Sequence, residues 1–143
     1  MPIKRSIILT SLMRHEGYRR TAYADTVGKL TVGYGRNLDD VGVTRDEAAL
    51  LLENDVTQAI AECLQAWPWL ASLDDVRSAV VVEMAVNMGV PSLRGFKKML
   101  AACEKGDYAT ASAEMLDSRW RAQVGARAYR LAQQMASGKV PQI

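Results

Sequence analysis

Apolar residues near the start of the chain recur at the spacing of a helix. Ile8 and Leu12 lie four residues apart, and Glu16 takes the next position in the same series. Because residues four apart share one face of a helix, the pattern predicts a helix over 3–16 that carries Glu16 on its inward-facing side. Gly17 then supplies the residue that ends this helix.

From 21 to 35 the apolar period changes to two, which is typical of a β-hairpin. One face of its second strand holds Leu30, Val32 and Tyr34, and the opposite face holds Thr31, Gly33 and Gly35. The face of Thr31 therefore offers a strip of backbone with few side chains, which a bulky polymer can approach. The remaining segments indicate helices.

A long helix is predicted over 44–66, because 44–47 has the form of a capping box and no Gly or Pro follows within this range. It would span about 35 Å. The next helix, which Ser72 or Asp74 caps and Gly89 ends, is apolar nearly all round, as is typical of a helix at the centre of a core. Shorter helices are predicted over 92–104, 107–116 and 126–137.

Together these elements predict an α+β fold that is mainly α, with a small β-hairpin lobe and a helical lobe joined by the long helix. We expect a single domain over 1–143. Lobe one covers about 14–55, and lobe two covers about 67–143 together with the N-terminal helix. With 143 residues of which 49% are hydrophobic, the chain is long enough to bury one good core.

Charge and cysteine content narrow the function classes. The net charge is +2 and the basic residues are scattered, which argues against a module that binds nucleic acid specifically. Cys63 and Cys103 lie in apolar helical patterns without metal-ligand spacing, so we predict buried free thiols, with a disulfide as the less favoured alternative, and no metal. We expect no cofactor. The start of the chain is too short and too polar for a membrane span and lacks a cleavage site, so we expect cytoplasmic synthesis without a signal peptide.

Two carboxylates with unlike surroundings suggest acid/base chemistry. Glu16 lies at the negative end of a helix near apolar residues, which favours the protonated form that a general acid needs. Asp25 lies in a polar turn and is expected to stay ionised, and such a difference assigns acid and base roles. The hydroxyl of Thr31 can hold a water molecule, so the set fits glycoside hydrolysis.

Other conspicuous residues have simpler interpretations. His15 points about 100° away from Glu16 on the helix and is expected at the surface. Glu83 interrupts an apolar helix and is expected to meet an arginine, for which Arg127 is a candidate, or to face solvent. Four aromatic residues fit core packing better than stacking on sugars, namely Trp67, Trp69, Phe96 and Trp120.

The chain resembles the phage T4-type lysozymes, which belong to glycoside hydrolase family 24 and cut peptidoglycan. The resemblance covers nearly the whole chain, and its most specific part is the segment with Glu16, Asp25 and Thr31 followed by Gly-x-Gly. The other matching segments are 43–48, 72–74, 88–89, 95–96 and 118–120. The resemblance implies a two-lobed lysozyme-like fold.

It also implies a muramidase that hydrolyses the β-1,4 bond between N-acetylmuramic acid and N-acetylglucosamine with inversion. Glu16 would be the general acid, Asp25 the base that activates water, and Thr31 the residue that helps to place this water. Arg127 matches a family arginine that reaches the catalytic glutamate, which would lower the pKa of Glu16 and oppose the effect of the helix end.

Four further residues enter the prediction around this set. Asn87 is expected to support the active site by bonding backbone near the hairpin. Asn37 and Val86 fall where the family lines its groove, so we expect them to contact substrate. Arg36 stands where the family often has a histidine, and the segment between it and Thr44 is shorter than in the T4 enzyme, which predicts a smaller hairpin lobe and a more open groove.

Two alternatives stay open beside the lysozyme. A lytic transglycosylase needs one glutamic acid and no attacking water, so Asp25 and Thr31 argue against it. A lysozyme-like part of a phage tail that binds the cell wall is the other alternative. For an endolysin, the resemblance implies peptidoglycan strands as the substrate and a holin-type membrane protein that releases the enzyme to the wall, and we expect a monomer.

Overall fold

The computed structural model of the chain describes residues 2–140. It divides into two compact units, Met1–Leu50 (unit 1) and Leu51–Ile143 (unit 2), and the division falls inside the long helix α2 (Arg45–Ala66). The fold is mainly helical with a small antiparallel sheet, so the predicted α+β class is confirmed. The predicted lobe boundaries, with the N-terminal helix assigned to lobe two, stay predictions.

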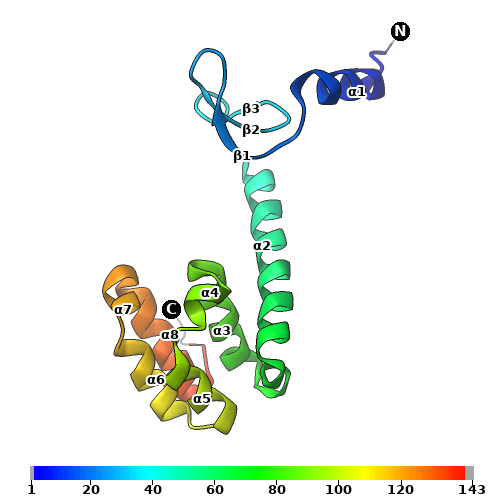
Figure 1. Cartoon of the computed structure of the whole chain (residues 1–143). Coiled ribbons are helices and arrows are strands. Elements are labelled where there is room, and N and C mark those ends of the chain that lie inside the picture. The colour runs from blue at the N-terminus through cyan, green and yellow to red at the C-terminus, as the bar shows by residue number, and fades with distance from the viewer. Residues whose placement is uncertain (1, 141–143) are drawn as a thin grey trace. The chain divides into compact units, whose positions relative to one another are not determined.

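Unit 1 contains the helix α1 (Arg5–Glu16) and the strands β1 (Arg19–Ala24), β2 (Leu30–Gly33) and β3 (Arg36–Asn37). The strands form an antiparallel sheet in the order β1-β2-β3, with β2 in the middle (Figure 1). The predicted hairpin corresponds to β1 and β2. The sequence does not predict β3, because two polar residues show no alternation.

A turn at two glycines replaces the last part of the predicted hairpin. β2 ends at Gly33, before the predicted end at Gly35. The φ angles of Gly33 and Gly35 are 68° and 79°, which side chains with a β-carbon rarely adopt. The chain therefore leaves the strand geometry here and turns directly into β3.

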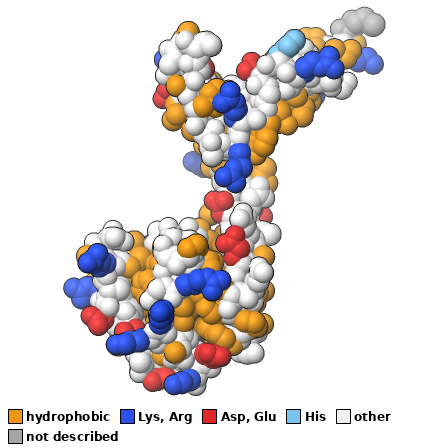
Figure 2. Space-filling model, viewed as in Figure 1, with side chains coloured by type: hydrophobic (Ala, Val, Ile, Leu, Met, Phe, Trp, Pro, Cys, Tyr) orange, Lys and Arg blue, Asp and Glu red, His pale blue; other side chains and the backbone are white. Residues whose placement is uncertain are grey.

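The helix α1 buries no side chain within unit 1. Ile8 and Leu12, from the stripe predicted to face inward, are 45% and 48% exposed. Figure 2 shows apolar side chains along this helix. Gly17 ends the helix as predicted, and its N–H donates to the carbonyl of Met13 at 3.1 Å.

Unit 2 is a helical bundle that includes the larger part of α2. Its other elements are the 3-10 helix η1 (Pro68–Ser72) and the helices α3 (Asp75–Met88), α4 (Val90–Leu93), α5 (Lys97–Lys105), α6 (Tyr108–Leu116), α7 (Arg119–Val124) and α8 (Ala126–Ser137). The predicted helix over 92–104 is in fact two helices, because α4, with Pro91 in its first turn, ends at Leu93 and the backbone of Phe96 is not helical. The short helix α7, which Ser118 caps, was not predicted from the sequence.

The helix α3 lies at the centre of the core of unit 2, as predicted. Val80, Val81 and Met84 are at most 1% exposed, and α8 packs against α3, α6 and α7. Asp74, one of the two predicted caps, accepts a hydrogen bond from the N–H of Arg77 at 3.1 Å. The predicted core packing of the aromatic residues is confirmed for Trp67 and Trp120, which are 9% and 4% exposed, and Trp69 and Phe96 pack partly buried against the same core.

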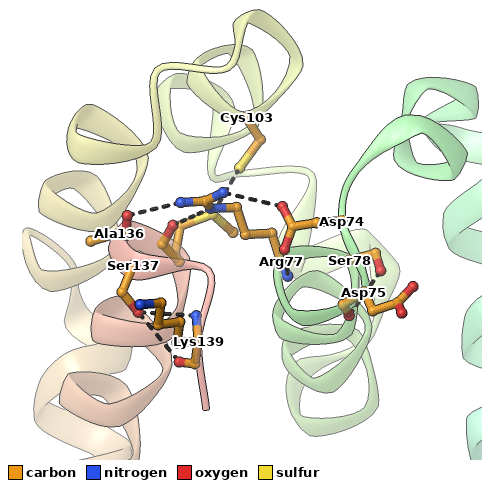
Figure 3. Close-up of polar contacts among 9 residues, drawn as sticks. Asp74, Asp75, Arg77, Ser78, Cys103, Ala136, Ser137 and Lys139 are labelled. Atoms are coloured by element: carbon orange, nitrogen blue, oxygen red, sulfur yellow. Dashed lines mark hydrogen bonds and ion pairs between the residues drawn. The ribbon is translucent and has the colours of Figure 1, made fainter. Parts of the chain in front are cut away.

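Arg77 joins the start of α3 to the end of α8 (Figure 3). Its guanidinium donates to the carbonyls of Met135 at 2.7 Å and Ala136 at 2.9 Å, and it pairs with Asp74 at 3.2 Å. The guanidinium also lies 3.7 Å from the ring centroid of Tyr108. A single side chain thus satisfies carbonyls that the last turn of a helix leaves without partners.

The two cysteines are free and buried, as predicted. Burial raises the pKa of both thiols, and it raises that of Cys103 to about 11.

Candidate functional site

Asp25 lies in the turn that joins β1 to β2. Its Oδ1 accepts hydrogen bonds from the N–H groups of Val27 at 2.9 Å and Lys29 at 2.8 Å. Its own N–H donates to the carbonyl of Lys29 at 2.9 Å, which closes the turn. In the described part of the chain, Oδ2 has no hydrogen-bond partner. One carboxylate oxygen therefore anchors the side chain and the other is available to accept a proton.

Thr31 lies in the middle strand, opposite Tyr23 in β1 and Asn37 in β3. Among residues 2–140 it is the only polar or charged residue that is fully buried, with 3% of its surface exposed. Its hydroxyl donates to the carbonyl of Lys29 at 2.9 Å. Because a hydroxyl has one proton to donate, Oγ1 is left with acceptor capacity only. Thr31 can thus bind a water molecule by accepting one of its protons.

Glu16 is the last residue of α1, and its carboxyl group lies directly against the turn at Gly35. A β-carbon on Gly35 would stand 2.6 Å from Oε2 and 2.8 Å from Cδ of Glu16. At Gly33, by contrast, an added β-carbon would meet nothing within 4 Å. The glycine-lined face predicted from the sequence therefore exists as one open position and one position that the Glu16 carboxyl covers.

Unit 1 thus holds all three residues predicted to carry the chemistry, and each has a distinct setting. Asp25 is anchored in a turn, Thr31 is enclosed in the sheet, and Glu16 lies on glycine backbone. Two carboxyl groups and one hydroxyl with acceptor capacity are components of acid/base hydrolysis. Their catalytic roles stay predictions.

Arg36 and Glu47 form an ion pair that was not predicted from the sequence. The guanidinium donates to Glu47 Oε1 at 2.7 Å and also bonds Oε2, while a further bond reaches the carbonyl of Gly42 at 3.0 Å. Glu47 itself was recognised as part of the capping box over 44–47, which the structure confirms. The only signal of the pair in the sequence was Arg36 at a position where the resembling family often has a histidine.

Asn37 uses its side chain within its own loop. Its Oδ1 accepts from the N–H of Asp40 at 2.9 Å, and its Nδ2 donates to Asp40 Oδ2 at 3.1 Å. The amide therefore shapes the segment after β3, and its predicted contact with substrate stays a prediction.

Arg127 and Val86 belong to unit 2. Nε of Arg127 donates to Glu83 Oε2 at 3.2 Å, so the arginine predicted for Glu83 is confirmed. Arg127, Glu83 and Val86 line a cavity of about 720 Å³, whose other walls are mostly apolar side chains from α2 and α3. The predicted contact of Arg127 with Glu16 stays a prediction. The predicted contact of Val86 with substrate stays one too.

Asn87 pairs with an aromatic residue of the same unit. Its Oδ1 accepts a hydrogen bond from Nε1 of Trp120 at 2.8 Å. Its predicted support of the active site stays a prediction. His15 is exposed, as predicted, with Nδ1 at 3.4 Å from the hydroxyl of Ser11.

Residues 2–140 lack both a metal-binding cluster and a helix that could span a membrane. These residues contain no group of three or more His, Cys, Asp or Glu side chains arranged to hold a metal ion. In the same range, no helix has both the length and the apolar character that crossing a membrane requires.

Comparison with known proteins gives a consistent set of matches. The family model described as "Phage lysozyme" matches residues 13–136. The chain is 27% identical to probable T4-type lysozyme 1 of Dictyostelium discoideum, over 93% of this chain and 95% of that protein. It is 24% identical to probable T4-type lysozyme 2 of the same organism, over 81% of this chain and 85% of that protein. The pre-baseplate central spike protein Gp5 of Enterobacteria phage T4 is 27% identical over 90% of this chain, but over only 27% of its own length.

Proposed function

Because this chain belongs to the phage lysozyme family, we propose that it is a muramidase that hydrolyses the β-1,4 bond between N-acetylmuramic acid and N-acetylglucosamine in bacterial peptidoglycan. A lysozyme-like function follows from the family match and from two relatives named as T4-type lysozymes. The specific bond and the residues that cleave it are the proposal.

The observation that carries the proposal is the setting of the three residues in unit 1. Glu16, as general acid, protonates the glycosidic oxygen, and its carboxyl group lies against the backbone of Gly35, which has no side chain. Asp25, as base, takes a proton from water through Oδ2, while Oδ1 stays bound to two N–H groups. The buried Oγ1 of Thr31 accepts a hydrogen bond from the same water.

We also propose the predicted association of α1 with lobe two. The support comes from each unit by itself, since α1 carries an apolar surface that unit 1 leaves exposed, and unit 2 has an apolar cavity of about 720 Å³. All tryptophans of the chain lie in unit 2, so Ile8→Asp and Leu12→Asp should lower the stability measured by tryptophan fluorescence. An unchanged stability in both variants would refute this association.

The biological setting proposed is that of an endolysin. It would reach the wall through a lesion made by a holin-type membrane protein and act there as a monomer. The similarity to a phage central spike protein supports the second candidate, a lysozyme domain that works within a phage tail. Deletion of this gene from a phage that carries it distinguishes the two, since loss of an endolysin blocks host lysis at the end of infection, whereas loss of a tail lysozyme impairs entry into the host.

The experiment that tests the activity is hydrolysis of purified peptidoglycan by Glu16→Gln and by a matched control. Glu53→Gln changes another exposed helical glutamate in the same way. We expect Glu16→Gln to lose about 100-fold or more in kcat and Glu53→Gln to keep the wild-type rate. Equal activity of Glu16→Gln and wild type would refute the role of Glu16. An inactive wild-type protein would refute the proposal that the protein hydrolyses peptidoglycan.

The products decide between hydrolysis and the transglycosylase. Hydrolysis adds one water to the reducing end, whereas a transglycosylase releases an anhydro-sugar that is lighter by one water. Inversion of the β-linked substrate gives the α-anomer first, which proton NMR detects before the anomers equilibrate. An initial β-anomer would indicate the retaining route instead.

A further inference from the structure

Arg36 makes contacts that the proposed chemistry does not use. Nη1 donates to Glu47 Oε1 at 2.7 Å and Nη2 donates to Glu47 Oε2, so two parallel bonds join the side chains. Nη1 also donates to the carbonyl of Gly42 at 3.0 Å. The two side chains are only partly exposed, at 37% and 38%. A pair of parallel bonds fixes orientation as well as distance.

Glu47 is itself held at the start of α2. The N–H of Thr44 donates to Glu47 Oε1 at 2.8 Å, and the N–H of Glu47 donates to the hydroxyl of Thr44 at 3.1 Å. These reciprocal bonds form a capping box, which satisfies N–H groups at the first turn of the helix. The Glu47 carboxylate therefore has a fixed place, and Arg36 is anchored to a helix end and not to a mobile side chain.

The backbone connects this anchor to the proposed acid. Arg36 follows Gly35 directly and pairs with Val32 in the sheet. The α-carbon of Gly35 faces the carboxyl group of Glu16, because a β-carbon there would lie 2.6 Å from Oε2. The turn beneath Glu16 is thus held by β2 on one side and by Arg36 on the other.

We propose that Arg36 is a positioning residue for Glu16: its pair with Glu47 fixes Gly35, and Gly35 in turn fixes the carboxyl group. This inference rests on the proposed role of Glu16 as the general acid. The competing explanation is that the pair only stabilises the hairpin. A displacement of about 1 Å at a catalytic group costs up to about 100-fold in rate. A purely stabilising contact changes the folded fraction and leaves the rate per folded molecule unchanged.

The test compares Arg36→Ala with a control that removes the same kind of contact elsewhere. Asp74 also caps a helix and pairs with an arginine, at 3.2 Å, but it lies in unit 2. On soluble peptidoglycan fragments, we expect Arg36→Ala to lose about 10- to 100-fold in kcat per folded molecule, with KM within about threefold of wild type. Asp74→Ala should keep kcat, and Arg36→Lys, with the charge but without the parallel bonds, should lie between Arg36→Ala and wild type.

A double variant shows whether Arg36 acts through Glu47. If it does, Arg36→Ala combined with Glu47→Ala loses no more kcat than Arg36→Ala alone. Additive losses, a kcat of Arg36→Ala within about twofold of wild type, or an equal loss in Asp74→Ala would each overturn the proposal.

A second measurement needs no turnover. In protein labelled with carbon-13 at glutamate carboxyl groups, the signal that disappears in Glu16→Gln belongs to Glu16. That signal should move in Arg36→Ala and stay in place in Asp74→Ala. An inactive wild-type protein would refute the proposed function, whereas an unmoved Glu16 signal in Arg36→Ala would refute the positioning role by itself.

Discussion

The carboxyl group of Glu16 occupies the space that a side chain at Gly35 would need, with Oε2 only 2.6 Å from the position of the missing β-carbon. The contact joins the end of α1 to the turn between β2 and β3, so it fixes the position of the Glu16 carboxyl group, the proposed acid. Gly35 is required there for two reasons, its positive φ and the carboxyl group in front of it.

Gly35→Ala should therefore reduce kcat by about 100-fold, because the new methyl group displaces the Glu16 carboxyl. It should also destabilise the fold by about 1–2 kcal/mol through the positive φ. Gly106→Ala is the matched control, since Gly106 has a φ of 81° with nothing within 4 Å of an added β-carbon. Turnover per folded molecule measures the difference, and equal turnover in the two variants would contradict the role of the contact.

Stability should fall in acid partly through Glu47. The Arg36 guanidinium and the Thr44 N–H lower the pKa of Glu47 from about 4.5 to about 2. A carboxyl group whose pKa is depressed by folding contributes stability above its unfolded pKa and loses that contribution as the pH falls through its folded pKa. The gap in urea midpoint between wild type and Glu47→Gln should thus be constant above about pH 5 and shrink between about pH 4.5 and 2. A gap that does not depend on pH would contradict the ionised pair.

Arg77→Ala should destabilise the protein by about 2–4 kcal/mol, because it removes charged hydrogen bonds to Met135 and Ala136 as well as the contact with Tyr108. Arg77→Lys should recover only part of this loss, because a single ammonium nitrogen replaces the two guanidinium nitrogens that donate to the two carbonyls. Urea unfolding followed by tryptophan fluorescence measures the change. Because Arg77 lies in unit 2 and the three residues of the proposed chemistry belong to unit 1, kcat per folded molecule should stay at the wild-type value.

Asn87→Ala should cost about 1–3 kcal/mol, because it leaves the indole N–H of the buried Trp120 without its partner. In a Trp120→Phe background the same change should cost less, since no donor remains to be satisfied. Urea titrations of the four proteins give the change in the free energy of unfolding that Asn87→Ala causes in each of the two backgrounds. Equal costs in both backgrounds would show that the bond contributes nothing to stability.

Local signals in the sequence predicted most of the helices. Gly17 and Gly89 end α1 and α3 where expected, and Asp74 caps α3, because each signal acts on neighbouring backbone. The break at Phe96 and the short helix α7 were missed, since each depends on packing within unit 2 and leaves little periodicity in the sequence.

The candidate site was predictable in composition but less so in its contacts. Asp25 and Thr31 stand close together in one hairpin, so local reasoning found them. The pair of Arg36 with Glu47 and the contact of Glu16 with Gly35 each join residues from different elements, and only the folded chain brings them together. Glu83 and Arg127 were the exception, because a lone carboxylate in an apolar helix calls for a cation.

The buried thiols make unit 2 separately observable. Both cysteines of the chain lie in that unit, and unit 1 has none. The thiolate is the form of cysteine that attacks a thiol reagent, and burial disfavours this form and blocks access to it. Cys63 and Cys103 therefore react only when the helices around them open. The rate of thiol modification in native buffer therefore reports the opening of unit 2.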